Sequence, residues 1–181
     1  REPRTRWPKQ VDQPTVRPPA LDGAAAAVTF IGHSTFLIQT AAANILTDPM
    51  SSRCAGPLNR IGPRRVRRPA VSFDDLPPVS TVLLSHNHYD HCDLPTLRRL
   101  ARRFDPLVVT PLENGRVVRS AGIRRIEECD WWQQAAMSAL PVTLTPARHF
   151  SARTPFDRNR ALWSGFVLTA GNVKQHSAKF K

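Results

Sequence analysis

An apolar run that ends abruptly in histidines constrains the fold of this sequence more than any other feature. Residues 79–85 read VSTVLLS, and residues 86–91 read HNHYDH. An apolar run of this kind, without alternation, is typical of a strand that is buried on both faces. The sequence therefore predicts a buried strand that leads directly into a loop rich in histidine and aspartate.

A helix is predicted directly after this loop. Asp93 can cap its N-terminus, and Pro95 fits the first turn, where the missing N–H costs nothing. Helical spacing places apolar residues on one side and arginines on the other, namely Leu94, Leu97, Leu100, Ala101 and Phe104 against Arg98, Arg99, Arg102 and Arg103.

Further strands are predicted on both sides of this unit. They cover residues 26–32, 34–40, 44–49, 106–111, 123–128 and 161–170, with a strand followed by a loop over 140–150 and a short helix over 112–121. The alternation of strand and helix predicts an α/β fold with a mixed sheet. Residues 1–25, interrupted by five prolines, are expected to form an irregular arm, residues 26–172 the domain, and residues 173–181 a divergent polar tail.

The composition favours anionic partners without choosing among them. The 181 residues carry a net charge of +12, which suits phosphate groups, nucleic acid or anionic lipid headgroups; arginine-rich amino-acid usage explains the charge equally well. Three widely spaced cysteines without a CxxC pair argue against a disulfide scaffold. With no visible signal peptide or apolar stretch of about 20 residues, a cytoplasmic location is expected, with association to a membrane surface left open.

The histidine-rich loop predicts a metal site. Zinc binds imidazole nitrogen and carboxylate oxygen. In an extended stretch His86, His88 and Asp90 would point to one side and His91 to the other, so one loop could serve two adjacent metals. Two alternatives stay open, namely a single metal without catalysis and a polar loop whose histidines occur by chance.

Several segments of the sequence resemble one branch of the metallo-β-lactamase superfamily. SHNHYDH matches the HxHxDH signature of the superfamily. Six segments, over roughly residues 27–172, resemble the branch that contains N-acyl-phosphatidylethanolamine-hydrolysing phospholipase D. They are FIGHSTFLIQT, NILTDPMSSRCAGP, GPRRVRRPAV, LSHNHYDHCDLPTLRRLA, CDWWQ and TPARHFSARTPFDRNRALWSGFVL. The resemblance implies an αββα fold with flanking helices, and phosphodiester hydrolysis by a metal-activated hydroxide.

The resemblance also implies roles for individual residues. His86, His88 and His149 would hold one zinc ion. Asp90 and His91 would hold a second zinc ion, and Asp90 would also be catalytic. An anionic phosphoester or phospholipid is the implied substrate.

Three more residues are assigned on the same basis. His33 and Asp48 are expected to lie behind the metal ligands and orient their imidazoles, although Asp48 also suits a turn before Pro49. Arg153 is expected to contact an anionic headgroup, with a simple surface charge as the alternative. Trp131 and Trp132 are expected to pack in the core or at its rim.

The end of the sequence departs from the family pattern. No acidic residue follows Asp157, so the Gly-Asp-Thr motif whose aspartate bridges both metals is absent, as is the last histidine ligand; His176 matches neither. We therefore expect a truncated fold whose second half is largely missing, an uncovered apolar sheet face, at most one tightly bound zinc ion and doubtful activity. A nucleic-acid phosphodiesterase and a non-catalytic metal-binding remnant remain as alternatives, and the oligomeric state is left open.

Overall fold

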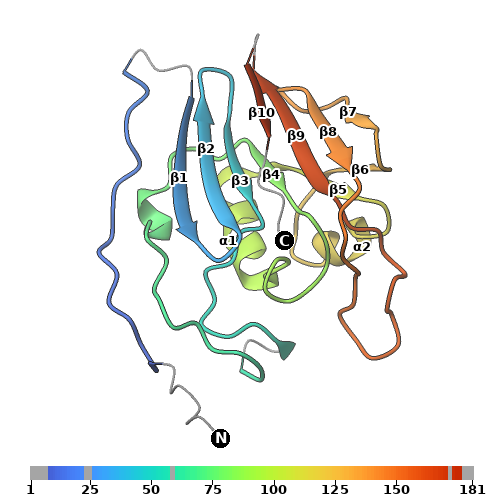
Figure 1. Cartoon of the computed structure of the whole chain (residues 1–181), viewed down its shortest axis with the longest axis horizontal. Coiled ribbons are helices and arrows are strands. Elements are labelled where there is room, and N and C mark those ends of the chain that lie inside the picture. Colours follow the sequence, from blue (N-terminus) through green and yellow to red (C-terminus); the bar gives the residue numbers. More distant parts are fainter. Residues whose placement is uncertain (1–7, 23–25, 58–59, 171–172, 177–181) are drawn as a thin grey trace, which may run out of the picture.

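Two β-sheets packed face to face form the centre of the protein (Figure 1). The computed structural model describes residues 8–22, 26–57, 60–170 and 173–176. The first sheet has six strands in chain order, which are β1 (Ala26–Gly32), β2 (Thr35–Thr40), β3 (Asn44–Thr47), β4 (Thr81–Leu83), β5 (Leu107–Pro111) and β6 (Arg125–Cys129). The second has the order β10 (Val173–His176), β9 (Gly165–Ala170), β8 (Val142–Thr145) and β7 (Gln134–Ala135).

The first sheet is mixed, as the sequence predicts. β1, β2 and β3 pair antiparallel, whereas β3, β4, β5 and β6 pair parallel. The parallel crossovers carry helix α1 (Leu94–Phe104) between β4 and β5 and helix α2 (Gly115–Arg119) between β5 and β6. Because β2 runs against β3 and β3 runs with β4, the β1–β2 turn lies at the same sheet edge as the carboxyl ends of β3 and β4.

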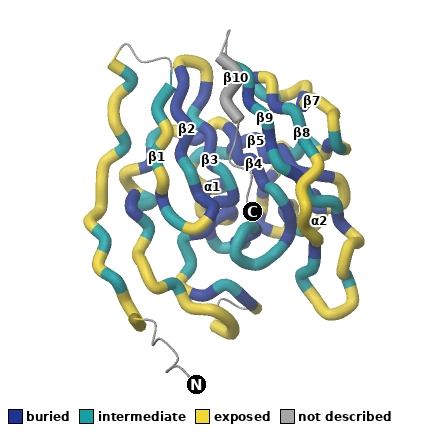
Figure 2. The backbone as a smooth tube through the Cα atoms, viewed as in Figure 1, coloured by how far each residue is buried: buried dark blue, intermediate teal, exposed yellow. Residues whose placement is uncertain are grey.

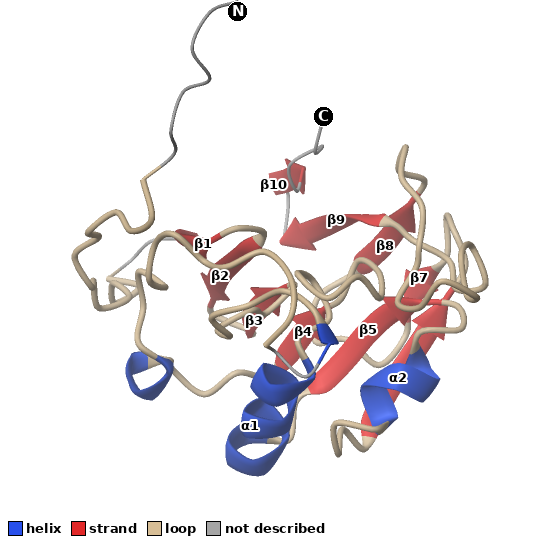
Figure 3. Ribbon diagram, turned by 90° about the horizontal axis from the view of Figure 1, so that it is seen from below, coloured by secondary structure: helices blue, strands red, loops and turns tan. Residues whose placement is uncertain are grey.

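The protein has three layers, namely the helices, the first sheet and the second sheet, with one apolar core between each pair of adjacent layers. The helices cover one face of the first sheet and the second sheet covers the other (Figure 3). Val82 and Leu84 belong to the core on the helix side, and Leu83 belongs to the core between the sheets. All three are 0% exposed, so the prediction of a strand buried on both faces is confirmed.

The expectation of an uncovered sheet face is wrong for most of the first sheet. Ile45, Leu83 and Val109 pack against Leu144 and Leu168 of the second sheet. Figure 2 shows β4 and β5 as buried strands at the centre of the protein. The face is open at β1, where Val28 is 58% and Phe30 51% exposed. There the Phe30 ring packs on Phe36, with centroids 5.1 Å apart.

Asp93 lies at the start of α1, but its carboxylate does not cap the helix backbone. It accepts hydrogen bonds from the backbone N–H groups of Ser51 and Ser52 and from the hydroxyls of Ser52 and Thr96. Instead of capping the helix, Asp93 therefore connects α1 to the segment after β3 through hydrogen bonds. The second helix is also shorter than the predicted range 112–121.

The segments flanking the domain are partly ordered against it. Val11 and Val16 of the N-terminal arm donate backbone hydrogen bonds to Val66 and Ala70. Residues 173–176, expected in the polar tail, pair antiparallel with β9, and residues 177–181 lie outside the described residues. Within the described part of the chain, every helix is too short or too polar to cross a membrane.

Replacing Leu144 by alanine should lower the free energy of unfolding by about 2–5 kcal/mol, because it leaves a cavity between the sheets. Val28→Ala, which trims an exposed side chain, should cost far less. Urea unfolding followed by circular dichroism measures both. Equal costs would mean that the second sheet is not packed on the first.

Candidate metal centre

The loop after β4 changes direction at His88. The backbone N–H groups of His91 and Cys92 both donate to the His88 carbonyl, over 3.1 and 2.7 Å, and close a turn. The expected alternation therefore ends at His88, and Asp90 lies with His91 rather than with His86. The grouping implied by the family resemblance describes the loop better than extended-strand geometry does.

Three histidines form the first group of candidate ligands. His86 and His88 come from the loop after β4, and His149 comes from the loop after β8 in the second sheet. His86 Nε2 lies 2.7 Å from His88 Nδ1 and 3.0 Å from His149 Nε2. The gap from His149 Nε2 to His88 Nδ1 is 3.3 Å. Three ring nitrogens from two sheets thus converge on one point.

His33, Asp90 and His91 form the second group. His33 Nε2 lies 2.8 Å from Asp90 Oδ2, and His91 Nε2 lies 3.6 Å from the same oxygen. His33 was expected behind the ligands, but its ring faces Asp90 directly, so it is itself a candidate ligand. The strand order explains this, because it brings the β1–β2 turn to the edge of the sheet where β4 ends.

The two groups adjoin each other. The ring centroids of His86 and His91, one from each group, are 4.2 Å apart. The His33 and His91 rings meet edge to face at 5.3 Å. Two groups of three side chains that could each hold a metal ion therefore lie side by side.

Asp48 lies next to His91, and its role in orienting a metal ligand stays a prediction. It is 3% exposed, and its carboxylate accepts from the Ser85 N–H and hydroxyl at 2.7 Å each and from His91 Nδ1 at 2.8 Å. The bond to Nδ1 leaves His91 Nε2 turned toward Asp90. A buried carboxylate behind an imidazole is a common device for holding a ligand ring in place.

Ser85 extends this network, and the sequence reading did not single it out. Its hydroxyl lies 2.8 Å from His86 Nδ1. Because that hydroxyl gives its one hydrogen to Asp48, it accepts from the His86 Nδ1–H. The lone pair of His86 Nε2 then points to His88 and His149.

The pKa values of these side chains suit metal binding. Burial, with the neighbouring histidines adding to it, lowers the pKa of His86 to about 2. Burial and adjacent histidines also lower the pKa values of His88 and His149. Burial alone would raise the pKa of Asp90, but the hydrogen bond from His33 and the charge of His91 hold it below its usual range. Neutral imidazoles and an ionised carboxylate are the forms that bind metal.

The pKa of His91 is shifted in the opposite direction to those of His86, His88 and His149. Burial alone would lower its pKa, but the hydrogen bond to Asp48 and the charges of Asp48 and Asp90 raise it. A metal at His91 Nε2 would therefore compete with a proton.

Arg153 contacts the loop instead of facing solvent. Its Nη1 donates to the carbonyls of Asn87 and Cys92 at 3.0 Å each, and its guanidinium lies 4.1 Å from the Tyr89 ring centroid. Through these contacts Arg153 joins the His149 loop to the loop after β4. The expected contact of Arg153 with substrate stays a prediction.

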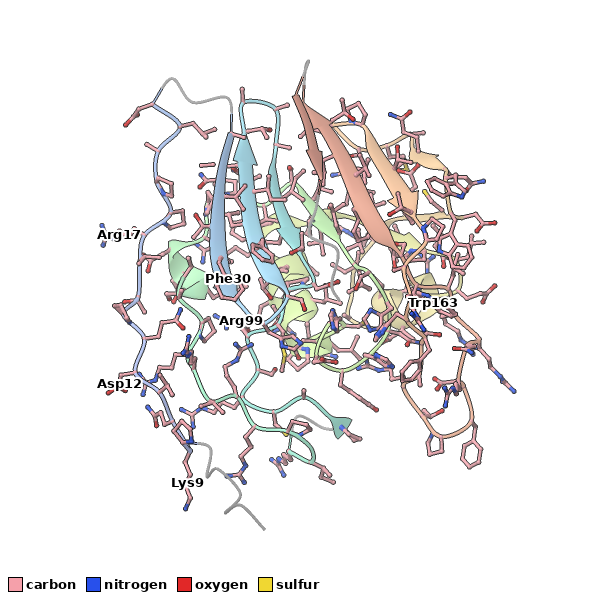
Figure 4. All side chains as sticks on the ribbon, in the orientation of Figure 1. Lys9, Asp12, Arg17, Phe30, Arg99 and Trp163 are labelled. Carbon is pink, nitrogen blue, oxygen red and sulfur yellow. The ribbon has the colours of Figure 1, made fainter. Side chains whose placement is uncertain are left out.

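Tryptophans support the His149 loop. Trp163, labelled in Figure 4, donates from Nε1 to the Ala147 carbonyl at 2.8 Å. Trp131 donates in turn to the Trp163 carbonyl at 2.6 Å, and the two rings are 6.0 Å apart. Trp131 thus packs at the rim as expected, whereas Trp132 is 72% exposed.

Sequence comparisons identify relatives for this chain. The family model described as "Beta-lactamase superfamily domain" matches residues 43–177. An uncharacterized protein of Mycobacterium tuberculosis is 38% identical over 86% of this chain and 42% of its own length. N-acyl-phosphatidylethanolamine-hydrolyzing phospholipase D 1 of Caenorhabditis elegans is 29% identical over 80% of this chain and 43% of its own length. The chain thus spans less than half the length of these relatives.

Solved structures share the fold at low sequence identity. A metallo hydrolase from Ignicoccus hospitalis has a TM-score of 0.58 at 20% identity, over 82% of this chain and 57% of its own. CmlA, a diiron β-hydroxylase from Streptomyces venezuelae, has a TM-score of 0.60 at 19% identity, over 82% and 28%. These matches concern the fold alone.

Asp48→Asn should weaken metal binding by about 10–100-fold, because an amide cannot accept all three hydrogen bonds that the carboxylate accepts. Asparagine tolerates the positive φ of 35° at this position. Asp74→Asn, at an exposed carboxylate paired with Arg103, is the matched control. Competition with a coloured zinc chelator measures both affinities, and a wild-type value for Asp48→Asn would contradict the assigned role.

The free energy of unfolding of the metal-free chain should fall as the pH drops below about 6.5. The folded chain keeps His86 neutral down to about pH 2, whereas the unfolded chain takes up that proton. The fall approaches about 1.4 kcal/mol per pH unit for His86 alone. His91 has a raised pKa in the folded state, so it binds its proton more readily when folded and opposes the His86 effect around pH 6.5. At lower pH His91 is charged in both states and adds no slope.

Urea unfolding with a chelator present, between pH 7.5 and 5.5, measures this dependence. His86→Asn should make the fall shallower. A flat profile for the wild-type chain would show that the histidines titrate normally in the folded state.

Proposed function

The chain belongs to the beta-lactamase superfamily, and on this premise we propose that it carries the metal-binding part of a metal-dependent hydrolase. The bond proposed for cleavage is the phosphodiester bond of a phospholipid. One observation carries the proposal, namely the contact between two three-residue donor groups, whose His86 and His91 rings are 4.2 Å apart. Two neighbouring metals suit the displacement of an oxygen at phosphorus, because both the attacking and the leaving oxygen need their charge offset.

The residues present fit a pair of metal ions. Each group supplies three donors, and catalytic zinc sites commonly use three protein ligands with one position open. The donors are imidazole and carboxylate, which zinc and iron both accept. We propose zinc for this chain, and metal analysis should include iron.

When bound, such ions would make water more acidic and offset negative charge on the phosphoryl group. The chain's own residues prepare the site for them. Asp48 holds His91 through Nδ1, and the Ser85 hydroxyl accepts from His86 Nδ1, so both Nε2 atoms face the site. Asp90 is kept ionised by His33 and His91, so it acts as an anionic ligand at neutral pH and is a poor proton donor.

The substrate class is proposed from charge and relatives. The net charge of +12 suits an anionic substrate. A relative that covers most of this chain is a phospholipase D in Caenorhabditis elegans. A cytoplasmic location with contact to a membrane surface is part of the same proposal.

Zinc titration should show a tight step and a weaker step. The tight step is expected at His86, His88 and His149, since three neutral imidazoles converge there with one of them fully buried. The second group includes the half-exposed His33 and Asp90 and should bind more weakly. His149→Ala should abolish the tight step and leave the weaker one, and His33→Ala should do the reverse.

Calorimetry and elemental analysis of the purified chain measure these steps. Hydrolysis of N-acyl-phosphatidylethanolamine and of a soluble phosphodiester should then require both steps. Binding of zinc that is unchanged in both variants would contradict the site. Turnover that persists in both variants would contradict the role of the metals.

A further inference from the structure

An arginine-rich segment after β3 is not part of the metal centre. We call its described residues, 53–57 and 60–68, the arginine loop. Its two limbs pair through the backbone, because Ala55 donates to the Pro63 carbonyl at 2.9 Å and Arg65 to the Arg53 carbonyl at 2.7 Å. In Figure 1 this loop, in teal, extends from the same end of the molecule as the orange loop between β8 and β9.

A cavity of about 460 Å³ lies between the arginine loop and the β1–β2 turn. His33 and Asp90 of the second donor group line it, so it opens onto the metal centre. A larger cavity of about 650 Å³ is lined by the same part of the loop together with residues of the N-terminal arm and α1. No candidate metal ligand lines that second cavity, so the smaller one is the functional candidate.

The smaller cavity is strongly cationic. Arg64, Arg65, Arg67 and Arg68 line it, and Asp90 supplies the one carboxylate among its lining residues. That carboxylate already accepts a hydrogen bond from His33. Among the described residues, none of these four arginines forms an ion pair, although the charge of Asp93 acts on Arg65. Guanidinium groups without acidic partners are suited to phosphate oxygens.

Arg65 is held in place at the inner end of this cavity. Its Nη2 donates to the Met50 carbonyl at 2.6 Å and its Nε to the Ser52 carbonyl at 3.2 Å. A Cβ on Gly32 would lie 3.3 Å from Arg65 Nη1, so the guanidinium is seated on the backbone beside His33. Because the side chain is already fixed, it would lose little entropy on binding an anion.

One wall of the cavity is apolar. Phe30 lines it and is 51% exposed, and Met50 and Val66 line it as well. Figure 4 shows Phe30 near the end of β1 that leads into the turn with His33. The cavity therefore presents cationic groups and an apolar surface to the same ligand.

We propose that this cavity is a subsite for a phosphate group that bears an apolar chain. Arg65 is the fixed donor, Arg64 and Arg68 form the cationic rim, and Phe30 contacts the chain. The inference deepens the proposed function and rests on it for the identity of the ligand as substrate. Its binding step needs no metal, so the two can fail separately.

The test is calorimetric titration of the full chain, zinc-loaded and chelator-treated, with octyl phosphate and with inorganic phosphate. Octyl phosphate should bind more tightly than inorganic phosphate in both forms. The double variant Arg64→Gln/Arg68→Gln should weaken octyl phosphate binding by about tenfold or more. Arg98→Gln/Arg102→Gln, which removes the same charge from the exposed face of α1, should leave it unchanged.

Three results would overturn the inference. The first is an equal loss in both double variants, which means a general effect of net charge. The second is equal binding of octyl and inorganic phosphate, or an unchanged preference in Phe30→Ala, which excludes the apolar wall. The third is binding that appears only with zinc and is unaffected by Arg64→Gln/Arg68→Gln, which assigns phosphate to the metals alone. Failure of the zinc titration described above, with octyl phosphate binding intact, would overturn the hydrolase and leave the subsite.

Discussion

Strand β4 has no face in contact with water, and the metal centre depends on that constraint. Val82 and Leu84 face the helices, and Leu83 faces the second sheet. A shift of the strand by one residue would therefore exchange the side chains that face the two cores. The position and direction of β4 are thereby set. The loop that begins at Ser85 therefore starts at a defined point, at the carboxyl end of β4.

A chain of buried hydrogen bonds then orients the imidazole rings on the loop after β4. Asp48 follows β3, the parallel neighbour of β4, and its carboxylate accepts from Ser85 and His91. Through the Ser85 hydroxyl the same network reaches His86. One aspartate thus sets the rings of two histidines that belong to different donor groups. A carboxylate in this place has to be buried to do so, and its hydrogen bonds offset the cost of burial.

The parts of the site that could be predicted from the sequence are those with local signals. The buried strand, the amphipathic helix α1 and the histidines at 86 and 88 all follow from patterns within about 20 residues. The donor group to which Asp90 belongs could not be predicted, because the turn at His88 ends the alternation of side-chain directions that an extended strand would have. His33 required the strand order, which no local pattern contains. Asp93 had the correct position for a cap, but Ser51 and Ser52 supply donors from a distant segment.

That the second sheet covers one face of the first sheet was not predicted, for a similar reason. The second sheet is built from short strands with half-buried residues, and its apolar members become a layer only when β8 and β9 pair. Length and family pattern suggested a bare face, whereas pairing between residues distant in sequence decides the outcome. The exposed edge at β1 is the part of that expectation that remains.

The first donor group draws on both sheets, and this has a thermodynamic consequence. His86 and His149 are 63 residues apart, and each belongs to a different layer. An ion held between them would link the two layers, and because the ligands converge only in the folded chain, its binding free energy would add to the free energy of unfolding. The fraction of folded protein would then depend on the concentration of free metal as well as on the packing of the two sheets.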